Sequence, residues 1–183
     1  MSKTTKAVAI SIGVFLALVI GAYAVTALFY KTPEIGVDGN GATIFKCNIN
    51  GLPESLGDVA PGDVKSMEPT TTSASNKDMY VFIRAVMPKF GDGGLYEFEN
   101  VNWTLEEAVE VDGKWVEVYR YDDILTPEST TTPMCSGLKM IDMGLADYAQ
   151  VEEFGITFGG YACGVDDTGI EEAWSAIRDN YGL

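Results

Sequence analysis

Residues 78–87 read DMYVFIRAVM and form the most regular β pattern in the chain. Successive side chains of a strand point to opposite faces of its sheet. One face carries five apolar side chains: Met79, Val81, Ile83, Ala85 and Met87. The opposite face carries Tyr80, Phe82, Arg84 and Val86. Because both faces are largely apolar, the pattern predicts a central strand of a sandwich that is covered on both sides.

Shorter β patterns lie on both sides of this segment, and turn-forming residues separate them. The strongest hairpin signal is Asp112-Gly113, between two such patterns. The predicted strands are residues 42–48, 63–69, 95–99, 102–105, 108–111, 115–121, 129–134, 138–140 and 154–163. Many short strands of this kind predict a mainly β protein, with residues 42–183 forming a jelly-roll-like antiparallel β-sandwich.

Helical patterns are confined to the second half of the chain. A short helix is predicted near residues 146–152. At the C-terminus, Thr168 and Glu171 have the spacing of a capping box, which marks the start of a helix. The apolar side chains that follow share one helical face: Ile170, Trp174, Ile177 and Tyr181. The stripe predicts a short C-terminal helix that packs on the core.

The N-terminal residues 1–24 have the composition of an export signal, predicted to be helical. Lys3 and Lys6 precede an uncharged apolar run, and Ala22 and Ala24 occupy the small-residue positions of a cleavage site before Val25. The uncharged run continues to Tyr30, which is long enough to span a bilayer as a retained anchor. We favour cleavage and expect a secreted, extracellular or cell-surface protein, which meets a membrane only during export or if the signal is retained.

Charge and composition limit the kinds of function. The 12 Lys and Arg stand against 27 Asp and Glu, for a formal net charge of −15. Such a surface repels nucleic-acid phosphates, so we expect no nucleic-acid partner. The chain has no histidine, which removes the Ser-His-Asp, Cys-His and HExxH arrangements. No catalytic, cofactor-binding or metal-binding residues are assigned, and a role other than catalysis is expected.

The three cysteines are Cys47, Cys135 and Cys163, and no two have CxxC spacing. In an oxidising compartment one pair forms a disulfide and leaves an odd thiol, and the sequence does not say which pair. The other interpretation is that all three are small buried apolar side chains, which we weigh slightly higher.

An ordered set of segments resembles the TasA/camelysin group, which are bacterial surface and biofilm-matrix proteins exported through a SipW-type signal peptidase. The segments are residues 21–24 (GAYA), 41–45 (GATIF), 59–63 (VAPGD), 76–84 (NKDMYVFIR), 115–121 with 125–131 (LTPESTT), and 161–166 (YACGVD) with 171–174 (EEAW). The sequence departs from the pattern at Glu128, Ser129 and Cys163-Gly164. Some members are labelled metalloproteases, an activity that we do not carry over because histidine is absent.

The resemblance implies a jelly-roll-like domain that forms homo-oligomers or fibres, with related matrix proteins as further partners. In such fibres a freed N-terminal segment adds as a strand to the neighbouring subunit. Residues 25–41 are then an extended arm, with the donor strand near residues 25–35. Val25, Ala27 and Phe29 alternate with Thr26, Leu28 and Tyr30, so either face of the segment fits an insertion. A plain flexible arm is the alternative.

Overall fold

A computed structural model describes residues 44–57, 59–165 and 169–181. The protein is mainly β, with antiparallel sheets and a short C-terminal helix, as predicted. The large sheet has the order β1 (Ile44–Cys47), β11 (Thr157–Gly164), β5 (Met79–Phe90), β9 (Lys114–Arg120) and β8 (Thr104–Val111). The two-residue β6 (Gly93–Gly94) pairs with the end of β5.

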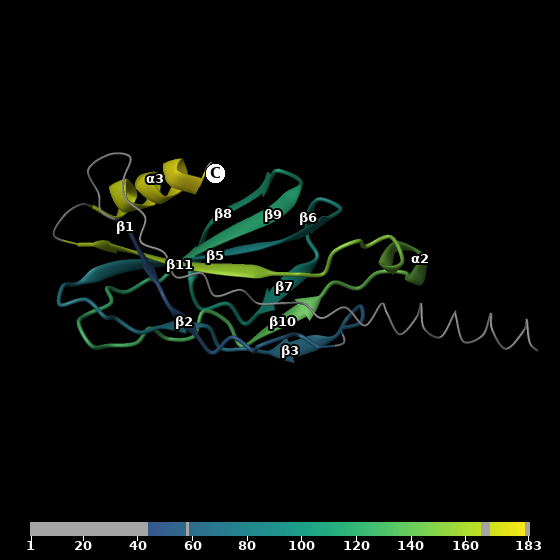
Figure 1. Ribbon diagram of the computed structural model, residues 1–183, viewed down its shortest axis with the longest axis horizontal. Helices are drawn as coiled ribbons and strands as arrows, with labels where there is room; N and C mark the ends of the chain where they lie inside the picture. Colours follow the sequence, from purple (N-terminus) through teal and green to yellow (C-terminus); the bar gives the residue numbers. More distant parts are fainter. Residues whose placement is uncertain (1–43, 58, 166–168, 182–183) are drawn as a thin grey trace, which may run out of the picture.

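A second layer lies against one face of the large sheet (Figure 1). It contains a three-stranded antiparallel sheet in the order β3 (Val64–Ser66), β10 (Gly137–Met140) and β7 (Tyr96–Glu99). A separate pair consists of β2 (Ile49–Asn50) and β4 (Thr70–Thr71). The single-turn helix α2 (Leu145–Tyr148) projects at one end of the molecule (Figure 1).

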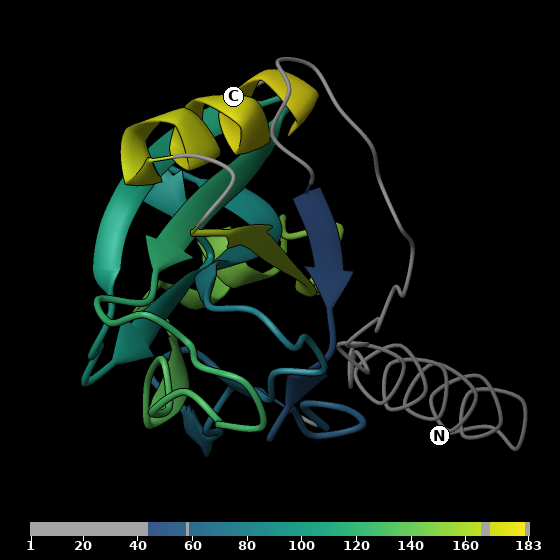
Figure 2. The ribbon, with the colours of Figure 1, turned by 90° about the vertical axis from the view of Figure 1, so that its left-hand side faces the viewer.

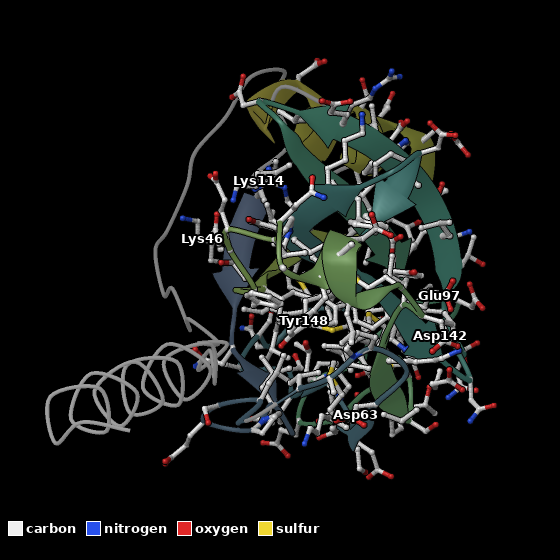
Figure 3. The ribbon with its side chains drawn as sticks, turned by 90° about the vertical axis from the view of Figure 1, so that its right-hand side faces the viewer. Lys46, Asp63, Glu97, Lys114, Asp142 and Tyr148 are labelled. Atoms are coloured by element: carbon white, nitrogen blue, oxygen red, sulfur yellow. The ribbon has the colours of Figure 1, made fainter. Side chains whose placement is uncertain are left out.

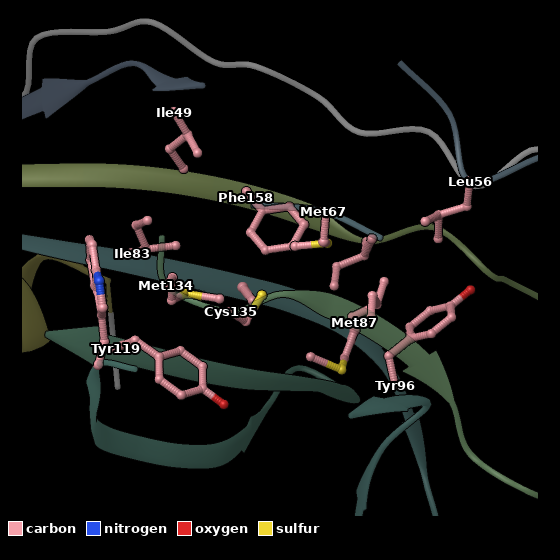
Figure 4. Close-up of a cluster of buried hydrophobic side chains, with 14 of the residues drawn as sticks. Ile49, Leu56, Met67, Ile83, Met87, Tyr96, Tyr119, Met134, Cys135 and Phe158 are labelled. Carbon is pink, nitrogen blue, oxygen red and sulfur yellow. The ribbon is translucent and has the colours of Figure 1, made fainter. Parts of the chain in front are cut away.

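The main core fills the space between the two layers (Figure 4). All five apolar side chains on the first face of β5 belong to it, and they meet Met67, Tyr96, Leu138 and Met140 from the second layer. The hydroxyl of buried Tyr96 donates a hydrogen bond to the Phe154 carbonyl oxygen at 2.7 Å, so its polar end is satisfied. These contacts confirm the predicted sandwich core.

Helix α3 (Ile170–Tyr181) covers the opposite face of the large sheet (Figures 1 and 2). Phe82 of β5 is fully buried there with Cys163, Ala173, Ala176 and Ile177. The ring of half-buried Trp174 stacks on Phe82 with a centroid separation of 6.0 Å. The central strand is therefore covered on both faces, as its sequence predicts.

Helix α3 differs in detail from its predicted start and stripe. The helix begins at Ile170, and the Glu172 carboxylate accepts a hydrogen bond from the Gly169 N–H at 3.3 Å. This capping contact is one residue later than the predicted one, and Thr168 lies outside the described residues. The fully buried positions of α3 include two alanines, Ala173 and Ala176, because a small side chain lets the helix approach the sheet closely.

The predicted hairpin is confirmed, and the strand before it is longer than predicted. Val111 pairs with Lys114 around a two-residue turn in which Asp112 and Gly113 have φ values of 50° and 77°. Positive φ at both positions is the geometry of a type I′ turn. The strands predicted at residues 102–105 and 108–111 are replaced by one strand, β8, which begins only at Thr104 and has a bulge between Leu105 and Glu107.

The prediction of a strand at residues 129–134 is wrong. This segment forms only one isolated bridge, between Thr130 and Thr72. Its backbone groups form hydrogen bonds with two different segments instead. The Met134 N–H donates to the Pro69 carbonyl oxygen, and the Met134 carbonyl oxygen accepts from the Asn102 N–H. Pro133 has no N–H to donate, which prevents a continuous ladder of hydrogen bonds here.

The short helix predicted near residues 146–152 is present as α2, but it begins one residue earlier, at Leu145, and ends already at Tyr148.

Candidate functional site: the open edge of the large sheet

The large sheet has two outer strands, β8 and β1, and they differ in how they are protected. Strand β8 carries Glu106, Glu107 and Glu110 and is interrupted by the bulge. These glutamates form ion pairs with Arg120, Arg178 and Lys89, respectively. Charged side chains and bulges prevent an edge strand from pairing with another chain. The β8 edge is therefore a poor place for a further strand.

Strand β1 forms the other edge; its register with β11 has no bulge, and its one charged side chain is Lys46. It pairs with β11 on one side only, and among the described residues no strand pairs with its outer side (Figure 2). Its sequence IFKC contains no carboxylate. Ile44 is buried, whereas 41% of the Phe45 surface is exposed. Among the described residues, β1 thus has a strand neighbour on one side only, and the exposed Phe45 side chain belongs to this edge strand.

A groove of about 500 Å³ lies beside this edge. One wall is formed by residues 45–48, which belong to β1 and the residue after it, and the other by residues 71–77. Met79, Leu125, Ala162 and Gly164 line the groove as well. Met79, Leu125 and Ala162 are core residues, so side chains that enter the groove reach the edge of the main core. We call this feature the β1 groove.

The two walls of the β1 groove separate from a common base. Strands β2 and β4 form this base, with Ile49 opposite Thr71 and Asn50 opposite Thr70. Asn48, which comes just before β2, and Thr72, which comes just after β4, line the groove. The sequence predicted a strand at residues 42–48 but no element at residues 70–76. The β-branched run at residues 70–72 was the available signal for the second wall.

The lining of the β1 groove differs in charge from the rest of the protein. It contains Lys46 and Lys77 but no Asp or Glu, although the whole chain has a formal charge of −15. In Figure 3, Lys46 extends from the side of the molecule opposite Glu97 and Asp142. The described lining of the groove therefore adds no negative charge that would repel an acidic chain.

The described cysteines form no disulfide with one another, and the fold places them in different surroundings. Cys47 lines the β1 groove, Cys135 lies in the main core, and Cys163 lies under α3 on the opposite face of the sheet. Burial raises the pKa of the Cys47 thiol to about 12, and burial raises the pKa of Cys135 to about 12 as well. The arrangement agrees with the interpretation of the cysteines as small apolar side chains.

Buried thiol and tyrosine hydroxyl groups make the stability of the protein sensitive to alkaline pH. Burial also raises the pKa of Tyr96 and of Tyr119, and the Glu117 carboxylate adds to the rise at Tyr119. The unfolded chain ionises its thiols near pH 9 and its tyrosines near pH 10, whereas the folded protein keeps these groups protonated. The unfolded state then binds fewer protons, so stability falls as pH rises.

We expect the free energy of unfolding to hold up to about pH 9 and to fall between about pH 9 and pH 12. Urea titrations across this range measure the effect. The double variant Cys47→Ala, Cys135→Ala is the control, and its stability should fall less steeply. A free energy of unfolding that does not change up to about pH 12 would contradict this account.

The residues predicted to be cleaved or donated lie outside the described residues. These are Ala22, Ala24, Val25, Ala27 and Phe29. Within the described part of the chain, no helix is long and apolar enough to cross a bilayer. Residues 44–57, 59–165 and 169–181 also contain no group of three Cys, Asp or Glu side chains placed to hold a metal ion.

Comparison with known proteins leaves the chain without an assigned relative: no family model, no curated protein and no solved structure matches it.

Proposed function

We propose that this protein is an extracellular structural protein that assembles into fibres by strand donation. In this proposal an extended segment of one subunit adds to the open edge of β1 in the next subunit. The observation that carries the proposal is the position of β1 at the margin of the described part of the large sheet, beside a groove that leads to the core. An added strand gains main-chain hydrogen bonds from the edge, and its alternate side chains fill the groove.

The donor in this proposal is residues 25–35, freed when the export signal is removed before Val25. Its alternating apolar side chains suit a strand that buries one face. One subunit then presents a donor and an acceptor at different places, which makes the contact heterologous; such a contact builds an open fibre when the rotation between subunits does not close a ring. The resemblance to the TasA/camelysin group supports the same role and a jelly-roll-like strand order. The proposed role is structural, with no catalytic residue.

A second candidate function is a membrane-anchored binding module. It is favoured by the uncharged run from Ala7 to Tyr30, which is long enough to span a bilayer if it is not removed. The β1 groove would then hold an extended segment of another protein. Intact mass of the exported protein separates the two, because a mature chain that begins at Val25 rules out the anchor.

The proposed function predicts that residues 25–35 are needed for assembly. We expect the protein that begins at Val25 to form fibres in electron micrographs and to sediment, whereas protein that begins at Gly36 stays monomeric. Two variants keep the length of the segment: one changes Val25, Ala27 and Phe29 to serine, and the other changes Thr26, Leu28 and Tyr30 to serine. The variant that alters the inserted face should also fail, because its side chains no longer fill the groove. Equal assembly of the Val25 and Gly36 forms would refute strand donation by this segment.

A further inference from the structure

We infer that the β1 groove is a binding site for a small, neutral, mainly apolar molecule that carries one hydroxyl or carbonyl oxygen. The apolar part of this ligand covers Met79, Leu125 and Ala162, which we call the floor of the groove. Its oxygen forms a hydrogen bond with the hydroxyl group of Thr71. The ligand binds the folded monomer, so the site requires neither fibre assembly nor the backbone edge of β1.

The β1 groove has the size and the floor of a small-molecule site. Its volume is about 500 Å³, within the range of about 300–1,000 Å³ that is usual for ligand pockets. Such pockets are mainly apolar and contain a few polar groups that orient the ligand. The three floor side chains are buried and apolar, and the exposed ring of Phe45 adds apolar surface to the lining. The floor therefore favours a mainly apolar ligand.

Thr71 supplies a polar group that orients such a ligand. Its backbone N–H donates to the Thr131 hydroxyl oxygen at 3.0 Å, and its carbonyl oxygen accepts from the Thr131 N–H at 2.9 Å. Because both backbone groups are used, the side chain is what Thr71 contributes to the lining of the groove. Thr71 is 1% exposed, and its hydroxyl oxygen forms no hydrogen bond with any described residue.

A buried hydroxyl group without a hydrogen bond is unfavourable and uncommon in folded proteins. The Cys47 thiol lies beside the Thr71 hydroxyl. Burial raises the pKa of this thiol to about 12, and contact with Thr71 lowers the pKa by a smaller amount. A thiol is a weak hydrogen-bond partner, so the Thr71 hydroxyl keeps its capacity to bond an oxygen. A ligand oxygen supplies the partner that the described part of the protein lacks.

The charge of the lining selects against ionised ligands. Among the described residues, the lining contains Lys46 and Lys77 but no Asp or Glu, so a cation would meet no carboxylate there. A carboxylate placed on the apolar floor would lose more hydration than one hydroxyl group replaces. The class that fits is a neutral molecule with one polar oxygen, such as a phenol or a ketone.

Two probes of the same shape test the site. They are p-cresol and toluene, which differ by one hydroxyl group. Each is titrated into the monomeric mature chain, and binding is followed through the methyl NMR signals of the floor residues. Met140 is the control, because its methyl group lies in the main core but not in the groove lining. We expect saturable shifts on the floor with both probes and none at Met140. Floor signals that neither probe shifts would overturn the site, and fibre assembly would be unaffected by that result.

The valine variant of Thr71 tests the proposed hydrogen bond. Thr71→Val removes the hydroxyl group and keeps the shape of the side chain. We expect it to lower the affinity for p-cresol relative to toluene about tenfold, because one hydrogen bond to the ligand is lost. Thr131→Val is the matched control, because Thr131 is also buried but its hydroxyl already accepts from the Thr71 N–H and does not line the groove. It should leave the ratio unchanged. An unchanged ratio in folded Thr71→Val would contradict the assignment.

Thermal unfolding of the same two variants shows whether the fold itself uses the Thr71 hydroxyl. We expect Thr71→Val to have a midpoint at least as high as that of the original protein, because the lost group has no hydrogen bond within the described part of the chain. Thr131→Val should lower the midpoint, because it leaves the buried Thr71 N–H without its acceptor. Equal losses in both variants would show that the hydroxyl serves the fold and would overturn its role in ligand binding.

Discussion

Replacing Phe82 with alanine is expected to lower the free energy of unfolding by about 3–5 kcal/mol. Phe82 is fully buried in the central strand β5, between the large sheet and α3. Its ring stacks on Trp174 with an interplanar angle of 20°. The change removes this contact and leaves a cavity that rigid neighbouring strands do not close. Small domains have about 5–15 kcal/mol of stability in total, so this loss is a large part of it. Urea denaturation measures the change.

Phe45→Ala is the matched control for this prediction. It removes the same ring from β1, where Phe45 is 41% exposed. We expect it to cost less than about 1 kcal/mol, because little apolar area returns to water. Its effect should appear in assembly instead, because Phe45 lines the β1 groove. If Phe45→Ala and Phe82→Ala destabilise the monomer equally, the assignment of Phe82 to a core between sheet and helix is wrong.

The second prediction concerns Gly160, which holds β1 close to β11. Gly160 pairs with Cys47 on β1 and with Ile83 on β5. A Cβ at this position would lie 2.7 Å from the Cys47 carbonyl oxygen and 2.9 Å from the Cys47 Sγ. The carbonyl belongs to the backbone of β1, so relief of the clash must move that strand. We expect Gly160→Ala to cost about 1–3 kcal/mol and to weaken assembly.

Gly159→Ala is the control, one residue earlier on the same strand. Its Cβ would lie 2.6 Å from the Tyr161 hydroxyl oxygen, and all three of its closest contacts are with that side chain. Tyr161 is buried under α3, so this variant should also lose stability; the atoms that it displaces belong to a side chain and not to the backbone of β1, so assembly should persist. Sedimentation and urea denaturation of the two variants make the comparison. Unchanged assembly of Gly160→Ala would show that the position of β1 does not matter.

Local sequence patterns predicted the elements whose form depends on near neighbours. The alternation in residues 78–87 predicted the buried strand, and Asp112-Gly113 predicted the hairpin, because both depend on residues close in the chain. For residues 129–134, the local sequence pattern gave a wrong prediction. Their apolar and β-branched side chains suggested a strand, but Pro133 and hydrogen bonds to residues far along the chain, Pro69 and Thr71, determine their path.

The β1 groove could not be predicted from local patterns. The groove depends on two pairings, Ile49 with Thr71 and Met79 with Leu125. It also depends on the position of β1 at the margin of the sheet. All three are contacts between segments that are distant in the chain. The sequence showed that residues 42–48 form a strand, but an edge strand and a central strand of four residues have similar patterns. The order of strands had to come from the structure.

A cysteine scan of residues 25–29 tests strand addition at the β1 groove most directly. Each position is changed to cysteine in turn, and chain-to-chain disulfides with the native Cys47 are measured on non-reducing gels under mild oxidation. Cys47 lines the groove, and side chains of a paired strand alternate between its two faces. We predict cross-links at alternate positions only, either at residues 25, 27 and 29 or at residues 26 and 28, and none after Cys47→Ala. Cross-links at every position, or equally strong cross-links at neighbouring positions, would contradict the account.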